Sequence, residues 1–355
     1  MTNSFELSLG KDFDMNRNFR SRIYLLVLMI AIFAVWKYRE NQSKEILVQG
    51  FTMGTIAYNI KYLDTEFSNH KQEIDSILRD FNQSLSTYIP DSEISRFNKE
   101  GKVTFSSPYF YDVLEASAKV YRQSNGAFDP TLGPLIDAWG FGNGKTLRLD
   151  SSRVDSLLNF VGFDKLKYDE TQLSKSILGL KLNFSAIAKG QAIDVVADWL
   201  SSIGITDYMV EIGGEVRANG KNIEGNFWTI AIEVPDEARI GGIFDAIYLE
   251  NKGMASSGNY RIFRVLEDGR KVAHTIDPRT GFPEMQTLLS ANVLAPNCML
   301  ADGFATACMV LGLEESIRLI ESDPTLEAYF IYADDDGELV TYISPGLKGK
   351  TLGDS

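Results

Sequence analysis

The sequence predicts a protein of the α+β or mixed α/β class, with mixed sheets flanked by helices. Stretches with alternating apolar residues and stretches with apolar residues at helical spacing are interleaved along the whole chain. No low-complexity tract or short-period repeat divides it after the N-terminal region. With 355 residues, 44% of them hydrophobic, the chain can bury a large core. We therefore expect a single domain over residues 47–355.

The first element along the chain is an uncharged apolar run at residues 23–36, IYLLVLMIAIFAVW, with Arg17, Arg20 and Arg22 before it. A basic segment followed by a short apolar core is typical of an export signal. The run is shorter than the roughly 20 residues that span a bilayer. We predict an uncleaved signal anchor, with a signal core or a helix packed on the domain as alternatives.

The anchor divides the N-terminal region into three parts. Residues 1–22 form a basic region in which Met15 is a possible true start, and residues 37–46, KYRENQSKEI, form a polar linker. The rest of the chain is then expected outside the cytoplasm, tethered to the inner (cytoplasmic) membrane in the periplasm or an equivalent extracytoplasmic space.

The first half of the domain is expected to mix strands and amphipathic helices. Residues 47–63 alternate and are rich in β-forming residues, so they predict two strands or one bent strand. Helical spacing of apolar residues predicts helices at 66–86, 107–126 and 151–162. A short strand at 180–184 is expected to run into a helix at 186–203.

The second half is expected to be richer in strands. Helices are predicted after Asp302 and at 314–322, and Asp334–Gly337 is expected to be the turn of a closing hairpin. The predicted strands are 208–212, 215–219, 228–233, 246–249, 254–257, 260–266, 330–333 and 339–343.

Composition excludes several classes of function. The net charge is −13, which argues against nucleic-acid binding because phosphate contacts need a basic face. The chain has two cysteines, Cys298 and Cys308, and two histidines, His70 and His274, so a zinc cluster or a multi-histidine metal site is excluded. The cysteines lie in an apolar stretch and predict buried thiols, although a disulfide stays open.

Two early turns carry side chains that suit a flat ligand. In residues 51–55, FTMGT, glycine lets a ligand approach the backbone and Met53 offers a soft surface, whereas a β-bulge is the simpler interpretation. In residues 85–98, Tyr88 precedes a proline turn and could stack on an aromatic ring. The simpler interpretation there is that Asp91 or Ser92 with Glu93 caps a short helix.

Two later segments suggest polar contacts. Residues 126–142 contain prolines and glycines that fix an unusual backbone, and the carboxylate of Asp129 could bind a ligand amide or hydroxyl. Residues 183–194, NFSAIAKGQAID, predict a strand-to-helix turn whose N–H groups, with Lys189, suit a phosphate. Asp194 could simply pair with a neighbour.

Gly213-Gly214 in EIGGEVR is either a plain hairpin turn or room for a ligand against the backbone. His274 is followed by Asp277 and Arg279, so it is a candidate general base for activating a hydroxyl, although a lone histidine is more often structural.

Asp302 and Thr306 are four residues apart and project from one face of the predicted helix. One carboxylate and one hydroxyl, completed by water and phosphate oxygens, suit Mg²⁺. The alternative is that Asp302 only caps the helix.

Taken in order, these segments resemble the ApbE family, the FAD:protein FMN transferases. The resemblance covers about residues 47–345. It rests on TMGT, STYIPDSEISRFN, GAFDPTLGPL with WGFG, SAIAKGQAID, EIGGEVR, SSGNY, HTIDPRTG and APNCMLADGFATA.

The resemblance implies a Mg²⁺-dependent enzyme with FAD as its substrate. FMN would be moved to a threonine hydroxyl of an acceptor flavoprotein, typically a subunit of a membrane redox complex, and AMP would be released. His274 would activate the acceptor hydroxyl, and the metal would be held by Asp302, Thr306 and the backbone carbonyl of Ala186. The implied FAD-lining residues are Met53, Tyr88, Ala127, Phe128, Asp129, Asn183, Lys189 and Ile276.

Three features depart from the family pattern. Asn183 stands where many members carry Asp, Tyr88 stands where some carry Trp, and the lipid-anchor cysteine of many members is missing. Two other functions stay open: an FAD pyrophosphatase that uses water as the acceptor, and a non-catalytic flavin-binding protein. The acceptor protein and the oligomeric state do not follow from the sequence.

Overall fold

The structure is a computed structural model that describes residues 17–40, 43–143, 147, 149–235, 241–258, 263–265, 271–283 and 287–354. The N-terminal helix α1 spans Arg17–Glu40. Within these described ranges, no helix is both long enough and apolar enough to cross a membrane. Helix α1 and the first strand, which begins at Lys44, both extend into the predicted linker at 37–46.

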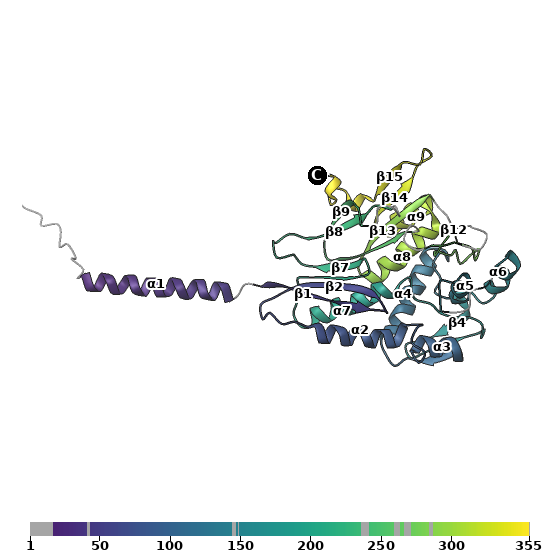
Figure 1. Ribbon diagram of the computed structural model, residues 1–355, viewed down its shortest axis with the longest axis horizontal. Helices are drawn as coiled ribbons and strands as arrows, with labels where there is room; N and C mark the ends of the chain where they lie inside the picture. The colour runs from purple at the N-terminus through teal and green to yellow at the C-terminus, as the bar shows by residue number, and fades with distance from the viewer. Residues whose placement is uncertain are drawn as a thin grey trace, which may run out of the picture. The chain divides into compact units, whose positions relative to one another are not determined.

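An eight-stranded sheet forms the centre of the unit made by residues 45–64 and 68–355 (Figure 1). The pairings β2–β6, β6–β7, β7–β10, β10–β13, β13–β14 and β14–β15 are antiparallel. In sheet order the strands are β1 (Lys44–Thr52), β2 (Ile56–Asp64), β6 (Tyr208–Ile212), β7 (Glu215–Asn219), β10 (Lys252–Gly258), β13 (Leu288–Ala295), β14 (Glu327–Ala333) and β15 (Leu339–Ile343).

Helices cover one face of this sheet. Helices α7 (Ala188–Ser202) and α8 (Cys298–Leu311) pack directly on it, and α2 (Lys71–Leu85) and α4 (Tyr109–Gln123) pack on those two helices (Figure 1). The largest hydrophobic core lies between these layers and includes Tyr58, Phe110 and Phe304. The remaining α-helices of this unit are α3 (Glu93–Glu100), α5 (Gly133–Trp139), α6 (Ser151–Leu158) and α9 (Leu313–Ser322).

The hairpin of β8 (Trp228–Glu233) and β9 (Ile243–Leu249) covers the other face. Strand β7 shows how the two faces divide. Val216 and Ala218 point into the core under this hairpin, while Glu215 and Arg217 bond to side chains of α7. This alternation is the period of two expected for a strand buried on both sides.

Smaller sheets complete the fold. One has the order β3 (Lys102–Thr104), β5 (Gln172–Lys175) and β4 (Leu166–Tyr168), and the other pairs β11 (Phe263–Val265) with β12 (Lys271–Ala273). This arrangement confirms the predicted α+β class.

The predicted strand at 180–184 is wrong, because only an isolated bridge between Lys181 and Leu132 forms there. Helix α8 begins four residues before Asp302, and the side chain of Asn297 caps it by accepting from Leu300 N–H. Asp302 is therefore not the cap.

Candidate active site

Two of the turns described above, and the end of strand β10, lie at one end of the central sheet. The β1–β2 turn contains Met53, and the β6–β7 turn contains Gly213, whose N–H donates to Ala57 O at 3.1 Å. The antiparallel register places Gly258, at the end of β10, opposite Ser290 at the start of β13. The start of α7 joins this end, because Lys189 reaches Glu215 at the start of β7.

Helices α7 and α8 approach each other closely beside these turns. A Cβ on Gly190 would lie only 2.3 Å from the carbonyl oxygen of Cys298, so no larger residue fits without a shift of the backbone. The close approach lets Gly190 N–H donate to Asp302 Oδ2 at 3.1 Å. Glycine here serves helix packing and so fixes the position of the Asp302 carboxylate.

Asp194 locks the same two helices together. Its oxygens accept hydrogen bonds from Cys298 N–H at 2.9 Å and Met299 N–H at 2.8 Å, two of the unpaired amides at the start of α8. Arg217 also donates to it at 3.0 Å. Burial raises the pKa of Asp194 to about 6, although Arg217 and the two amides favour the ionised form. The role of Asp194 is thus structural.

The candidate cation site has one carboxylate with an unused oxygen. Asp302 is 3% exposed, and within the described ranges no donor reaches its Oδ1. Burial raises the pKa of this carboxyl, while Lys189 and Gly190 N–H partly oppose that shift. Thr306 lies one turn further along α8 and is partly exposed.

Lys189 and Glu215 lie in the electrostatic field of Asp302. Lys189 Nζ is 2.5 Å from Glu215 Oε1. Burial acts to lower the pKa of Lys189, but Glu215 and Asp302 together raise it. Burial, reinforced by Asp302, raises the pKa of Glu215 to about 7 in spite of Lys189. Two buried carboxylates thus share one ammonium, which leaves a surplus negative charge when both are ionised.

These residues fit a hard divalent cation. Such an ion takes oxygen ligands and keeps much of its hydration, so one carboxylate, one hydroxyl and one carbonyl suffice. No group of three or more His, Cys, Asp or Glu side chains in the described ranges is arranged to bind a metal. The candidate set does not need such a group.

Ala186 and Asn183 lie in the segment that leads into α7. Asn183 Oδ1 accepts from Ser185 N–H at 2.8 Å, and its own N–H donates to Pro130 O at 2.8 Å. Ala186 follows in the turn before Ala188, the first residue of α7. The side chain of Asn183 therefore shapes the turn that carries the Ala186 carbonyl.

Of the two residues proposed to contact a flat ring, one is well exposed and the other is partly buried. Tyr88 is 74% exposed in the turn between α2 and α3. Met53 packs partly against the core and has a positive φ of 47° in the turn that joins β1 to β2. Ser92 caps α3 by accepting from Ser95 N–H, as the sequence suggested.

Ala127, Phe128 and Asp129 are buried. Both oxygens of Asp129 accept hydrogen bonds from the chain itself: Oδ1 from the amide and hydroxyl of Thr131, and Oδ2 from Phe163 N–H at 3.2 Å. Burial raises the pKa of Asp129, and these hydrogen bonds oppose the shift. The Asp129 carboxylate thus holds its own loop, and its contact with a ligand stays a prediction.

His274 follows β12 directly and lies partly exposed, with its ring 6.5 Å from that of Phe141. Asp277 accepts hydrogen bonds from the amide and the guanidinium of Arg279, so it fixes the turn after His274. Ile276 is buried with Leu132, Trp139 and other residues of α5 and α6.

Loops that are distant in sequence are tied together around the site. Asn143, after the WGFG segment, donates to Thr87 O beside Tyr88, and Trp139 Nε1 donates to Gly281 O at 2.9 Å. The Lys181–Leu132 bridge joins the proline-rich loop to the segment before α7. Sequence reasoning did not select Glu215, although a glutamate that starts a buried strand after a glycine turn was a usable signal. Asn259 and Tyr260 of the SSGNY segment lie outside the described residues.

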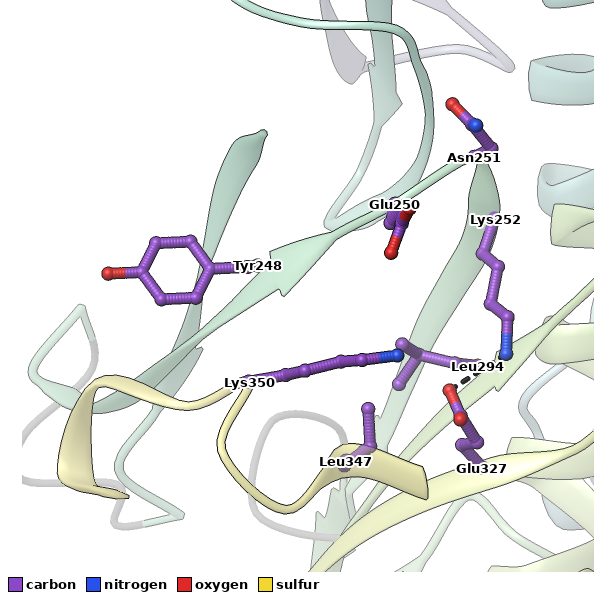
Figure 2. Close-up of a pocket in the computed structure, with 8 residues that line it drawn as sticks. All are labelled: Tyr248, Glu250, Asn251, Lys252, Leu294, Glu327, Leu347 and Lys350. Atoms are coloured by element: carbon purple, nitrogen blue, oxygen red, sulfur yellow. Dashed lines mark hydrogen bonds and ion pairs between the residues drawn. The ribbon is translucent and has the colours of Figure 1, made fainter. Parts of the chain in front are cut away.

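A cavity of about 230 Å³ lies at the opposite end of the sheet (Figure 2). Lys252 donates to Glu327 at 2.8 Å on its wall, and Lys350 extends into it from the C-terminal segment. Leu294 and Leu347 line its apolar part. None of the sequence-predicted site residues lines it.

The comparisons with known proteins converge on one family. A profile described as the ApbE family matches residues 53–330. A curated relative from Haemophilus influenzae, named FAD:protein FMN transferase, is 40% identical over 327 residues, covering 88% of this chain and 93% of the relative. A relative of the same name from Vibrio cholerae is 38% identical over 313 residues, covering 84% and 90%.

Solved structures agree with these sequence matches. The structure titled flavin transferase ApbE from Vibrio cholerae superposes with a TM-score of 0.76 at 36% identity, covering 87% of this chain and 99% of that one. The apo flavinyl transferase ApbE of Pseudomonas stutzeri also gives 0.76, at 33% identity, with 87% and 97% covered.

Proposed function

The chain belongs to the ApbE family and is an enzyme that transfers FMN from FAD to protein, and we propose that a divalent cation, Mg²⁺, assists it. The cation is held by Asp302, Thr306 and the backbone carbonyl of Ala186. The observation that carries this proposal is the buried Asp302 carboxylate, whose Oδ1 has no donor within the described ranges. Bound there, the cation supplies positive charge to phosphate oxygens.

The turns at the same end of the sheet suit the two halves of FAD. Tyr88 is exposed and able to stack on a ring system, and Met53 adds a polarisable side chain. Ala127, Phe128, Asp129, Asn183 and Ile276 shape the surrounding loops, with Asp129 acting through its own turn. Lys189, at the start of α7, adds a cation to helix N–H groups that favour phosphate.

In the proposed transfer, the acceptor threonine Oγ bonds to the phosphorus of the FMN half of FAD. The bond from that phosphorus to the bridging oxygen breaks, and AMP leaves with the bridging oxygen. His274 takes the proton from the threonine hydroxyl, because an imidazole can accept a proton near neutral pH. Asp277 and Arg279 fix the turn that follows His274.

Transfer to protein and hydrolysis differ only in the hydroxyl that reaches phosphorus. Incubation with FAD, Mg²⁺ and a threonine-bearing acceptor peptide separates them. Covalent flavin fluorescence on the peptide is expected, whereas free FMN without labelled peptide would identify a pyrophosphatase. FAD that stays intact would identify a flavin-binding protein without catalysis.

The test of the catalytic base is co-expression with an acceptor, wild type against His274→Ala. We expect fluorescent acceptor on the gel with the wild type and a loss of about 10²–10⁴-fold in transfer rate with the variant, the usual range for a general base. Transfer at the wild-type rate in His274→Ala would remove this residue from the mechanism.

We also propose that the apolar segment 23–36 tethers the enzyme to the inner membrane, with the catalytic domain on the extracytoplasmic side. The support is the basic-then-apolar sequence, which is typical of an export signal. Subunits of membrane redox complexes that carry a target threonine are the acceptors that such a location favours. Recovery of the full-length protein in the cytoplasmic soluble fraction would contradict the tether.

A further inference from the structure

Glu215 is a second carboxylate of the site, and only one of its two side-chain oxygens has a hydrogen-bond partner in the described residues. It is 3% exposed and is the first residue of β7, directly after the glycine turn. One oxygen, Oε1, pairs with Lys189 at 2.5 Å. The other, Oε2, is buried and has no hydrogen-bond partner within the described ranges. A buried carboxylate oxygen without a donor is unfavourable, so it calls for a missing partner.

The surroundings of Oε2 indicate that this partner is not a protein side chain from the turn. A Cβ on Gly213 would lie 3.7 Å from both Glu215 Oε2 and Lys189 Cδ, and only 2.8 Å from Ile56 Cγ2. Gly213 also has a positive φ of 64°, where a side chain is strained. Gly213 therefore adds no side chain of its own beside the Lys189–Glu215 pair, where Ile56 already packs closely.

The local charges favour a cation as the missing partner. Lys189 bonds to Glu215, and the next residue, Gly190, donates its N–H to Asp302, so the three charged groups lie in one region. Two carboxylates and one ammonium leave a net charge of −1 when all are ionised. A divalent ion at Asp302 brings hydration water, whose O–H groups are the donors that Oε2 lacks.

We propose that Glu215 is a positioning residue for the cation: Oε1 holds Lys189, and Oε2 accepts a hydrogen bond from the hydration shell of the ion bound at Asp302. This inference rests on the proposed function, because it presupposes the cation site. It gives the EIGGE segment a role beyond a plain hairpin turn. It also makes cation affinity depend on a residue that does not touch the ion.

The experiment measures Mn²⁺ binding to the full-length protein without FAD or acceptor, with free Mn²⁺ followed by electron paramagnetic resonance and displaced by Mg²⁺. Glu215→Gln is expected to weaken binding by about 10–100-fold, the usual effect of losing a group that bonds a metal's ligands. The matched control is Glu327→Gln, which removes a lysine-paired glutamate at the other end of the sheet. It is expected to bind Mn²⁺ within twofold of wild type.

Asp302→Asn separates the two proposals. If it abolishes Mn²⁺ binding while Glu215→Gln binds like wild type, the inference about Glu215 is overturned and the cation site stands. If Asp302→Asn itself binds like wild type, the cation site is wrong. Circular dichroism and the melting temperature verify that each variant is folded.

A second variant covers the case in which Glu215→Gln does not fold. Lys189→Met/Glu215→Leu removes the pair together, so Glu215 is not left buried without its lysine, and the sum of the local charges stays at −1, now carried by Asp302 alone. The proposal predicts Mn²⁺ binding at least tenfold weaker, because the acceptor is gone. Unchanged binding in this double variant would show that Oε2 has no part in holding the ion.

Discussion

Two lysine–glutamate pairs lie at opposite ends of the central sheet, on opposite faces, and they differ in their neighbours. Lys252 and Glu327 are 2.8 Å apart, with 28% and 13% of their side chains exposed. Lys189 and Glu215 are 2.5 Å apart, with 26% and 4% of their side chains exposed, so the pairs differ in the burial of the glutamate and not of the lysine. The first pair is balanced and partly solvated, whereas the second shares its ammonium with a third charge, Asp302.

This difference shows why similar ion pairs serve different purposes. A solvated pair contributes little to stability and leaves no demand for another ligand. A buried group with two carboxylates and one ammonium is short of positive charge, and that shortage is what a divalent cation and an ammonium-bound phosphate can satisfy. The cavity lined by Lys252 and Glu327 lies at the end of the sheet away from Asp302 (Figure 2).

The largest expected effect is on the rate of flavin transfer, when the carboxylate of Asp302 is removed. Asp302→Ala should lower the rate of flavin transfer by about 10²–10³-fold, because charge on the phosphate oxygens loses its stabilisation. FAD binding should weaken less. The measurements are covalent flavin on an acceptor and quenching of FAD fluorescence. Full transfer by this variant without Mg²⁺ would break the comparison between the two pairs.

Replacing the lysine of each pair should lower the free energy of unfolding by different amounts. Lys189→Met leaves Glu215 buried without a counter-charge, so we expect a loss of about 3–5 kcal/mol in the free energy of unfolding near pH 8. Lys252→Met should cost about 0–1 kcal/mol. Urea denaturation of the two variants provides the comparison, and equal losses would contradict it.

The pH dependence should carry the signature of Glu215. Its pKa is raised from 4.5 to about 7 by burial, so the folded state holds this proton while the unfolded state has lost it. Stability should therefore fall as pH rises from about 4.5 to about 7, by at most about 3 kcal/mol from this group. Glu215→Gln should flatten this part of the curve when no divalent cation is present. A slope that Glu215→Gln leaves unchanged would assign the proton to another group.

The smallest effect is expected from Glu327, whose side chain is 13% exposed. Glu327→Gln should change the free energy of unfolding by about 0–1 kcal/mol and leave flavin transfer unchanged. Thermal denaturation and the acceptor gel assay measure both. A marked loss of transfer would mean that the two ends of the sheet are coupled.

Local signals in the sequence predicted much of the fold. The hairpin strands at 208–212, 215–219 and 339–343 agree with the structure residue for residue, because glycine turns mark their ends. Strand β13 was not predicted. Its polar residues Ser290 and Asn292 are buried like its apolar ones, so the sequence pattern does not mark an exposed face. Helix α5 was not predicted, because its start, Gly133-Pro134, resembles a turn.

The sequence predicted the members of the candidate site better than their roles. Asp302 and Thr306 follow from helical spacing, and the ordered motifs place them in a family. The turn at Gly190 was expected to serve phosphate, yet its glycine is required by the contact with Cys298. The roles of Asp129 and Asp194 could not be predicted from the sequence, because only tertiary contacts decide which donors reach a carboxylate. Glu215 needed the packing of α7 on β7 to become visible.

The hydrogen bonds between α7 and α8 also determine at what stage of protein synthesis the site can form. Asp302 meets Gly190 across 112 residues, and Cys298 meets Asp194 across 104. Loop closure over such separations comes late in folding, because its entropy must be offset by many contacts formed together. A growing chain that has produced α7 but not α8 therefore lacks two of the three proposed cation ligands, Asp302 and Thr306. Flavin chemistry can begin only after nearly the whole domain has been made and has folded.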